Sequence, residues 1–409
     1  MEKIFINLII FIPMIGAMIF LFSKKVRQST FWQATVTPLA SIIGSGFLVS
    51  TPLLVLLVGK WAPIIMLIVV IVAYALGAAM RCNILYLEPL LKDEKQKHLW
   101  VCKLEILSRP ILGIAYIISA TFYLKLLSAF IFKPLGLDFH GLSSNLLTSI
   151  ILLFIGITGL FRGLKSLERL AEYSVNTKLG VIITLIISLL VYNAIEIYHG
   201  RWALKITTPQ SFNIVIKKIL GILIIIQGFE ISRYMGDAYT ASMRIKTMRY
   251  AQILSGIIYV VFVTLAMVLF NKITQINEIT IVHISYIVAP SLAIVLVIGA
   301  IMSQFSASVA DIIGGGELLA EASHKKISDK INFLLMAIVG IFLTWVTNIF
   351  EIISLASKAF ALYYAIHTFM ALMLCFKDHK LWRRWSRFFL YGALTLLMLA
   401  VVLFGIPSE

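Results

Sequence analysis

The stretch SIIGSGFLVSTPLL, residues Ser41 to Leu54, lies inside an apolar run that is long enough to cross a membrane. Gly44, Gly46 and Pro52 interrupt this run where an ordinary spanning helix has aliphatic residues. In hydrocarbon every backbone N–H and C=O needs a partner, so irregular backbone persists only where it is buried in protein or lines a watery cavity. The stretch therefore predicts a membrane helix that is broken at a binding site.

The composition of the whole chain indicates an integral membrane protein. Of its 409 residues, 60% are hydrophobic and 13% are charged. Apolar runs of about 20 residues, each sufficient to cross the hydrocarbon core, recur along the length. The net charge of +16 comes from basic residues in alternate gaps between these runs, as the positive-inside rule predicts. We therefore expect a lipid bilayer, and no nucleic acid, as a partner.

Twelve spanning segments can be marked in the sequence. They cover residues 4–22, 33–58, 61–80, 109–131, 144–161, 178–197, 214–233, 250–271, 281–310, 332–349, 352–376 and 386–406. Assigning alternate gaps to the cytoplasm places 25 of the 35 Lys and Arg residues there. We therefore expect a multi-pass protein of the cell (inner) membrane with both termini on the non-cytoplasmic side.

A second glycine break follows five spans after the first. The seventh segment reads ILIIIQGFEISRYMGD, with Gly228 at its centre. Interrupted helices at matching positions of two five-helix halves indicate a transporter built from inverted repeats. The expected fold is all-α, with a leading helix and linker at 1–31, repeats at 33–197 and 214–376, and a basic loop with a trailing helix at 377–409.

A broken membrane helix offers two kinds of ligand group. The half after the break presents free N–H groups and a positive dipole end, which suit a carboxylate, and the half before it presents carbonyls, which suit a cation. Glycine permits the backbone angles and the close approach that such a site needs. The alternative is that small residues only allow neighbouring helices to pack closely.

Several motifs resemble one transporter family. The strings ASIIGSGF and QGFEISRYMGD, the second followed by the basic MRIKTMRYAQ, look like the amino acid–polyamine–organocation superfamily. The resemblance covers residues 33–375 and implies the leucine-transporter fold, in which two inverted five-helix repeats hold the substrate between the broken first and sixth core helices. The leading helix is also similar to that of sodium–solute symporters with this fold.

The resemblance implies a substrate site on both broken helices. Amides near Ser45 and Gly46 would hold a carboxylate, with Phe47 and Phe229 as aromatic lids, or else as core residues. The remaining members of the implied site are Ser41, Gly44, Gln227, Gly228 and Lys125. Like Lys358, Lys125 lies inside a span near its outer end, where a lysine either lines an outward path or extends to the interface.

Two features bear on the coupling ion. Glu230 matches a glutamate of many proton-coupled relatives, although an acid here could also form a structural salt bridge. IMSQFSASVAD, residues 301–311, resembles the eighth core helix, which holds hydroxyls for sodium in sodium-coupled members. The implied sodium site contains the residues Ala40, Ile43, Ala300, Ser303, Gln304 and Ser306. Gln304 stands where a second hydroxyl is usual, and serines in membrane helices often bond only their own backbone.

A lysine in the middle of the fifth core helix serves some proton-coupled relatives. The lysine of that stretch here, Lys178, falls at the start of the apolar run 178–197. We therefore expect it near the cytoplasmic end and expect the lysine-based mechanism to be missing.

These features favour a secondary active transporter that works by alternating access. We expect it to move an amino acid or a similar small carboxylate-bearing solute, coupled to Na+. The alternatives are a proton-coupled symporter or exchanger that uses Glu230, and a transporter-like membrane sensor. No catalytic constellation and no P-loop is found in the sequence, so we expect neither an enzyme nor a nucleotide partner. We expect no cofactor besides the coupling ion, Na+ or H+, and no obligate protein partner.

Overall fold

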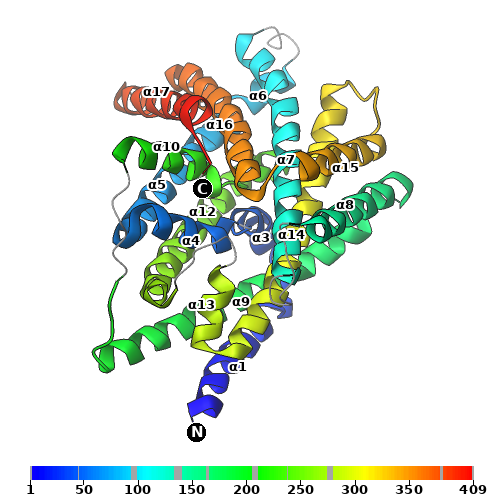
Figure 1. Cartoon of the computed structure of the whole chain (residues 1–409). Coiled ribbons are helices and arrows are strands. Elements are labelled where there is room, and N and C mark those ends of the chain that lie inside the picture. Colours follow the sequence, from blue (N-terminus) through cyan, green and yellow to red (C-terminus); the bar gives the residue numbers. More distant parts are fainter. Residues whose placement is uncertain are drawn as a thin grey trace.

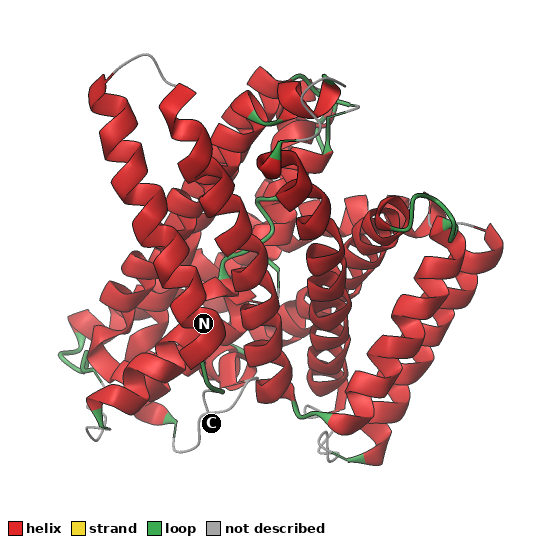
Figure 2. Cartoon of the chain, turned by 90° about the horizontal axis from the view of Figure 1, so that it is seen from above, coloured by secondary structure: helices red, strands yellow, loops and turns green. Residues whose placement is uncertain are grey.

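The computed structural model describes residues 2–44, 46–93, 99–132, 141–162, 165–204, 211–236, 238–273, 280–377 and 381–407. Within these ranges the chain consists of helices and loops and contains no strand (Figure 2). Ser45, one of the predicted substrate-binding residues, lies outside the described residues.

The described residues of the first half of the chain form nine α-helices and one 3₁₀ turn. They are α1 (Glu2–Leu21), α2 (Lys24–Arg27), α3 (Thr30–Ile42), α4 (Gly46–Val58), η1 (Gly59–Trp61), α5 (Ala62–Tyr86), α6 (Glu88–Lys92), α7 (Trp100–Phe132), α8 (Leu142–Arg162) and α9 (Lys165–Tyr198).

In the second half, the part of the chain that the structure describes forms eight α-helices and three 3₁₀ segments. They are α10 (Phe212–Ile222), η4 (Leu223–Ile225), α11 (Ile231–Tyr234), α12 (Ala241–Ala266), η5 (Met267–Lys272), α13 (Thr280–Val288), α14 (Pro290–Ala322), α15 (Asp329–Val346), α16 (Ile349–Leu374), η6 (Cys375–Lys377) and α17 (Leu381–Phe404).

The helices account for the twelve expected segments. Among the described residues, nine helical stretches are long and apolar enough to span a membrane, and one of these, Thr30–Lys92, contains two expected segments. The other two expected segments correspond to α1 and to the broken stretch α10–η4–α11. The prediction of an all-α membrane fold is confirmed.

Four expected boundaries were wrong. The segment 281–310 is divided, because α13 ends at Val288, Ala289 is extended, and Pro290 begins α14, the first-turn position that proline prefers. The helices α7, α9 and α12 each begin nine or more residues before the expected segment. Hydropathy marks the part of a helix that contacts lipid, whereas these helices continue into polar sequence beyond it.

Corresponding helices of the two halves pack against each other. In the first half α5, α7 and α8 follow the broken α3–α4, and in the second half α12, α14 and α15 follow the broken α10–α11. The contacts join α5 to α12, α7 to α14 and α8 to α15, and Figure 1 shows the last two pairs side by side. Two five-helix repeats of opposite orientation produce this pairing.

Glycine, rather than proline, breaks the first of the two interrupted helices. α3 ends at Ile42, Ile43 leaves the helical region with φ −86° and ψ 43°, and α4 starts at Gly46. Pro52 lies inside the continuous helix α4. The expectation that Pro52 contributes to the break was therefore wrong.

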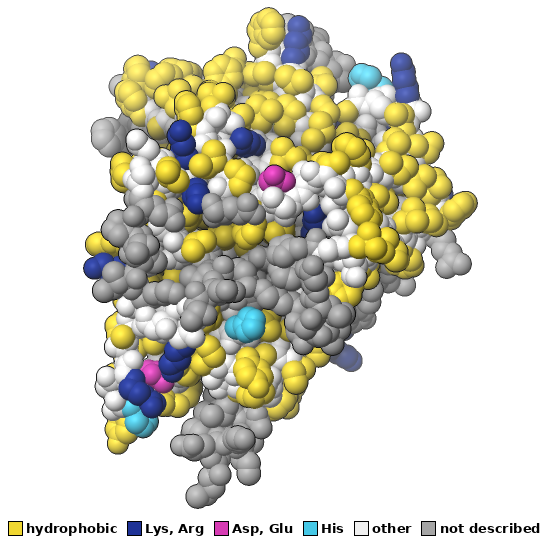
Figure 3. Space-filling model, viewed as in Figure 1, with side chains coloured by type: hydrophobic (Ala, Val, Ile, Leu, Met, Phe, Trp, Pro, Cys, Tyr) yellow, Lys and Arg dark blue, Asp and Glu magenta, His cyan; other side chains and the backbone are white. Residues whose placement is uncertain are grey.

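The exterior has the character of a surface that faces lipid. Large apolar side chains are exposed on many helices, and they dominate the face in Figure 3, where charged side chains are few and scattered. The interior also holds polar and charged residues, among them Glu105, Glu230, Arg233, Asp311 and His367. Buried charged groups in a membrane protein are candidates for function, because burial is costly unless they are paired.

A buried ion pair ties the second broken helix to its neighbours. Arg233 of α11 contacts the Glu105 carboxylate of α7 at 2.9 Å, and both side chains are at most 3% exposed. The same guanidinium lies 2.6 Å from Nδ1 of His367 on α16. Nε2 of His367 lies 3.1 Å from the Ser108 hydroxyl of α7. The cluster therefore links α7, α11 and α16.

Loss of this ion pair is expected to destabilise the protein strongly. Replacing one partner leaves an uncompensated buried charge, so Arg233→Gln should lower the free energy of unfolding by about 3–5 kcal/mol. The matched control is Arg201→Gln, because Arg201 is 60% exposed and its buried partner Glu196, at 3.5 Å, keeps a second ion pair with Lys272 at 3.3 Å. Loss of a solvent-exposed partner of this kind costs about 1 kcal/mol or less. Denaturant titration in detergent micelles measures both, and equal losses would contradict the buried pair.

Candidate functional site

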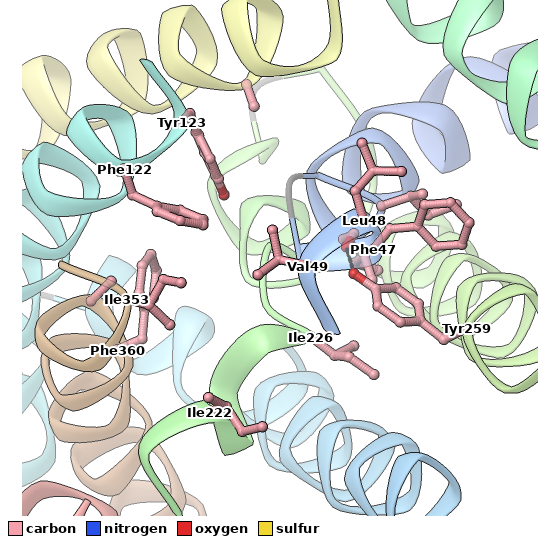
Figure 4. Close-up of a cluster of buried hydrophobic side chains, with 14 of the residues drawn as sticks. Phe47, Leu48, Val49, Phe122, Tyr123, Ile222, Ile226, Tyr259, Ile353 and Phe360 are labelled. Atoms are coloured by element: carbon pink, nitrogen blue, oxygen red, sulfur yellow. Dashed lines mark hydrogen bonds between the residues drawn. The ribbon is translucent and has the colours of Figure 1, made fainter. Parts of the chain in front are cut away.

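A cavity lies between the two broken helices, and we call it the central cavity. Figure 4 shows Phe122 and Tyr123 of α7, Ile222 of α10 and Ile353 of α16 pointing toward it. Its polar lining comes from Ser41, Gly44, Gly46, Ser119, Tyr123, Gln227 and Ser357. The volume is about 30 Å³, which is space for a few water molecules. A solute must therefore widen the cavity when it binds.

Two of the predicted glycines are required because the broken helices touch. A Cβ on Gly46 would lie 2.5 Å from the carbonyl oxygen of Ile225 and 3.1 Å from the Tyr259 hydroxyl. Gly228 has φ +104°, and a Cβ there would collide with the Ser41 side chain. Close helix packing and the break in the backbone therefore occur at the same place. The glycines allow both, so the packing interpretation and the broken-helix interpretation are compatible.

Tyr123, which was not among the predicted site residues, lies beside the first break. Its hydroxyl lies 3.5 Å from the Cβ position of Gly44, and it lines the central cavity together with Gln227. The structure thus brings Ser41, Gly44, Gly46 and Gln227 to one cavity. Tyr123 is one tyrosine among 15 in the sequence, so composition alone does not single it out.

The two predicted aromatic lids lie elsewhere. Phe47 is 1% exposed and packs on Tyr259 and Phe262 of α12, with ring centroids 5.6 and 4.2 Å away. Phe229 is fully buried and stacks on Tyr364 at 5.2 Å. Neither lines the central cavity. The lid assignment was wrong, because both rings pack against neighbouring helices as core residues.

Glu230 closes the break of the second interrupted helix. Its Oε2 accepts hydrogen bonds from the Gly228 N–H at 2.9 Å and from the Tyr364 hydroxyl at 2.6 Å. The Tyr116 hydroxyl lies 3.4 Å from Oε1. The side chain is fully buried, and no ion pair to it occurs among the described residues. The salt bridge considered as an alternative is therefore not found in the described part of the chain.

Lys125 lies outside the central cavity. Its Nζ donates to the carbonyl oxygens of Thr344, at 3.0 Å, and Thr347, and these residues form the C-terminal end of α15. A cation is favourable there because it meets unpaired carbonyls and the negative end of the helix dipole. The assignment of Lys125 to the substrate site was therefore wrong. Lys358 of α16 is half-buried and also does not line the cavity.

Replacing Lys125 separates its structural contact from substrate binding. Lys125→Met removes two charge-assisted hydrogen bonds, so the free energy of unfolding should fall by about 1.5–3 kcal/mol. Substrate affinity of the folded fraction should stay unchanged. Denaturant titration and binding measurements on the same preparation check both expectations. Unchanged stability with lost affinity would return Lys125 to the substrate site.

A second cavity, which we call the lysine cavity, is lined by three of the six residues of the predicted sodium site. It is lined by Ile43, Gly44, Ala300 and Ser303, together with Lys178 of α9. The Lys178 side chain is 5% exposed, and its Nζ donates to the carbonyl oxygen of Ala40 at 2.7 Å. Lys178 was expected near the cytoplasmic end of its segment, but it lies inside α9, which begins at Lys165, and its side chain reaches the last turn of α3 before the first break.

The other predicted sodium ligands are only partly available. The Ser306 hydroxyl donates to the Ser303 carbonyl of its own helix at 3.0 Å. The Ser303 hydroxyl and both polar atoms of the Gln304 side chain have no partner among the described residues, and Gln304 does not line the lysine cavity. The Ala40 carbonyl, which was a predicted sodium ligand, accepts a hydrogen bond from the Lys178 side chain. An ammonium group of the protein therefore lies where a metal cation was expected.

Comparisons with known proteins identify the family. A family model described as an APC superfamily transporter matches residues 24–405. The chain belongs to the APC superfamily of transporters. An uncharacterized protein of Aquifex aeolicus (strain VF5) is 39% identical over 408 residues, which cover 98% of this chain and 97% of that protein. This APC member is therefore a multi-pass membrane protein and a transporter rather than an enzyme.

Two solved structures share the fold of this APC member. A manganese transporter mutant (E129A) of Eremococcus coleocola superposes with a TM-score of 0.59 and 13% identity, over 91% of this chain and 87% of that one. A Na+-coupled sialic acid symporter in a substrate-bound outward-open state gives a TM-score of 0.53 and 14% identity, over 98% and 96%. The predicted leucine-transporter fold is confirmed. The substrates named for these two neighbours are properties of those proteins and are not assigned to this chain.

Filling the contact between the broken helices should abolish transport. Gly46→Leu places a side chain against the Ile225 carbonyl, so uptake should fall to background while the protein still inserts and purifies. The matched control is Gly392→Leu on α17, where a Cβ meets nothing within 4 Å. Normal uptake by Gly46→Leu in proteoliposomes would remove the broken helix from the site.

Proposed function

We propose that this APC member is a secondary active transporter that carries an amino acid or a similar small organic solute by alternating access and uses a proton as its coupling ion. The proposal is carried by one observation: Gly44 lines both the central cavity and the lysine cavity. A solute in one cavity and a proton on Lys178 in the other therefore act on the same break in the helix.

The central cavity supports the solute part of the proposal. α4 begins at Gly46 in the cavity wall, and the first turn of a helix has N–H groups without intrahelical partners. Such a helix end favours a negative group, so a carboxylate is the expected partner. The structural neighbours transport manganese and sialic acid by their names, so the fold by itself does not select the cargo.

Lys178 supports a proton in preference to sodium. Its ammonium contacts the Ala40 carbonyl, one of the oxygens that the sodium hypothesis needs. A protonated amine there supplies the positive charge that a metal ion would supply, and a neutral amine supplies none. The contact joins α9 to α3, so gain or loss of the proton changes how firmly the first broken helix is held.

Coupling follows if both ligands stabilise one arrangement of α3. A solute at Gly44 and a proton on Lys178 then each raise the population of the conformation that the other prefers. Glu230 is the second candidate for the titrating group, because this buried carboxylate holds the other break through the Gly228 N–H. Both residues contact broken backbone, and variants distinguish them.

Uptake into proteoliposomes tests the proposal. Purified protein is given pooled radiolabelled amino acids, with an inward proton gradient or an inward sodium gradient imposed in turn. We expect saturable uptake that only the proton gradient stimulates, and we expect Lys178→Met to reduce it to the level without a gradient. Lys330→Met, at an exposed position on α15, is the matched control.

The outcomes separate the alternatives. Stimulation by sodium alone would overturn the proton assignment, and loss of coupling in Glu230→Gln but not in Lys178→Met would move it to Glu230. Saturable flux without a bound protein partner excludes a sensor that does not transport. Absence of flux for every amino acid would overturn the solute class.

A further inference from the structure

Asp311 is a buried acid that neither the sequence analysis nor the coupling proposal uses. It lies on α14, which packs against α7, and it is 3% exposed. Its Oδ2 accepts a hydrogen bond from the Ser119 hydroxyl of α7. Ser119 lines the central cavity, so the Asp311 carboxylate is one hydroxyl group away from the solute.

The surroundings of the central cavity hold two buried acids, Asp311 and Glu230, without a paired cation among the described residues. Glu230 is fully buried and lies 3.4 Å from the hydroxyl of Tyr116, three residues before Ser119 on α7. The ion pairs in the described part of the chain involve other acids. No lysine or arginine is found among the described residues of the cavity lining. A buried carboxylate is costly unless a cation or a proton neutralises it.

An independent observation points to a ligand at the same place. Ser357 of α16 lines the central cavity, is 4% exposed, and has no hydrogen-bond partner for its hydroxyl among the described residues. Unsatisfied buried polar groups are rare in folded proteins. Ser119 and Ser357 therefore face one cavity from α7 and α16, and only Ser119 has a protein partner for its hydroxyl.

The geometry points to a subsite for the positively charged group of the solute, formed by Asp311 with Ser119 and Ser357, and this inference rests on the proposed transport of a small organic solute. The Ser119 hydroxyl donates to Asp311, so its lone pairs remain free to accept from an ammonium group. Its other contact, with the Tyr116 carbonyl, is 3.3 Å. The Ser357 hydroxyl can accept a second N–H.

The subsite gives the solute an orientation. An amine binds between α7 and α16, and a carboxylate, where the solute has one, binds at the start of α4. Asp311 is a positioning residue that acts through Ser119. This assignment replaces Lys125 as the charge that selects the solute and reverses its sign, so a solute without a positive group should bind poorly.

Three matched pools of compounds test the assignment on the purified protein in detergent. The first contains amino acids, the second the amines left after their decarboxylation, and the third the carboxylic acids left after their deamination. A ligand that binds the native state raises the unfolding temperature, and at equal concentration a tighter ligand raises it more. We expect the first two pools to raise it and the third to leave it unchanged.

Variants assign the effect to named residues. Asp311→Asn keeps the size of the side chain and removes its charge, so affinity for the amine-bearing pools should fall by about tenfold to a hundredfold, as for other hydrogen bonds to charged groups. Ser119→Ala should lower the affinity for the same two pools, and the third pool should still not bind. The matched control is Asp329→Asn, at an exposed position on α15, which should bind as the unmodified protein does.

The outcomes separate this inference from the proposed function. Stabilisation by the third pool equal to that by the first, unchanged binding of amines by Asp311→Asn and Ser119→Ala, or no stabilisation by any amine would each overturn the subsite. If the deaminated acids are nevertheless taken up into proteoliposomes, transport stands and only the subsite fails. If Asp311→Asn does not fold, Ser119→Ala decides the result.

Discussion

Backbone hydrogen bonding in a medium without water is the constraint on which the rest of this structure depends. Each break in a spanning helix leaves N–H and C=O groups that lipid cannot satisfy. Here the second break is closed by Glu230 bonded to Gly228, and the last turn before the first break is held by Lys178 bonded to Ala40. Ionisable side chains therefore hold the backbone at both breaks, so under the proposed function the same broken helices would respond to solute and to protonation.

The sequence predicted the elements that follow from local rules. Gly44, Gly46 and Gly228 marked both breaks, because little else explains paired glycines in apolar runs five spans apart. The resemblance then placed Ser41 and Gln227 at one site, and the structure brings them together. These residues were predictable because the backbone, which sequence pattern describes well, makes the site.

Side-chain partners across the fold were not predictable in the same way. The position of Lys178 depends on where α9 begins, and a polar first turn conceals that start from hydropathy. Lys125 was assigned to the solute because its depth in the span was visible, whereas the end of α15 beside it was not. Asp311 and Ser119 lie 192 residues apart, and only the packing of α14 on α7 shows that they meet.

The length of α9 has a mechanical consequence. Its 34 residues form a rod of about 50 Å at 1.5 Å per residue, and α1 and α14 pack along it. Lys178 attaches this rod to α3 well away from either end. A tilt of about 5° around that attachment would move the far end by roughly 2.5 Å, given the same rise per residue. The hydrogen bond between Lys178 and Ala40 would act as the pivot of this tilt. A small rotation there would displace the far end of α9 by about the diameter of an atom.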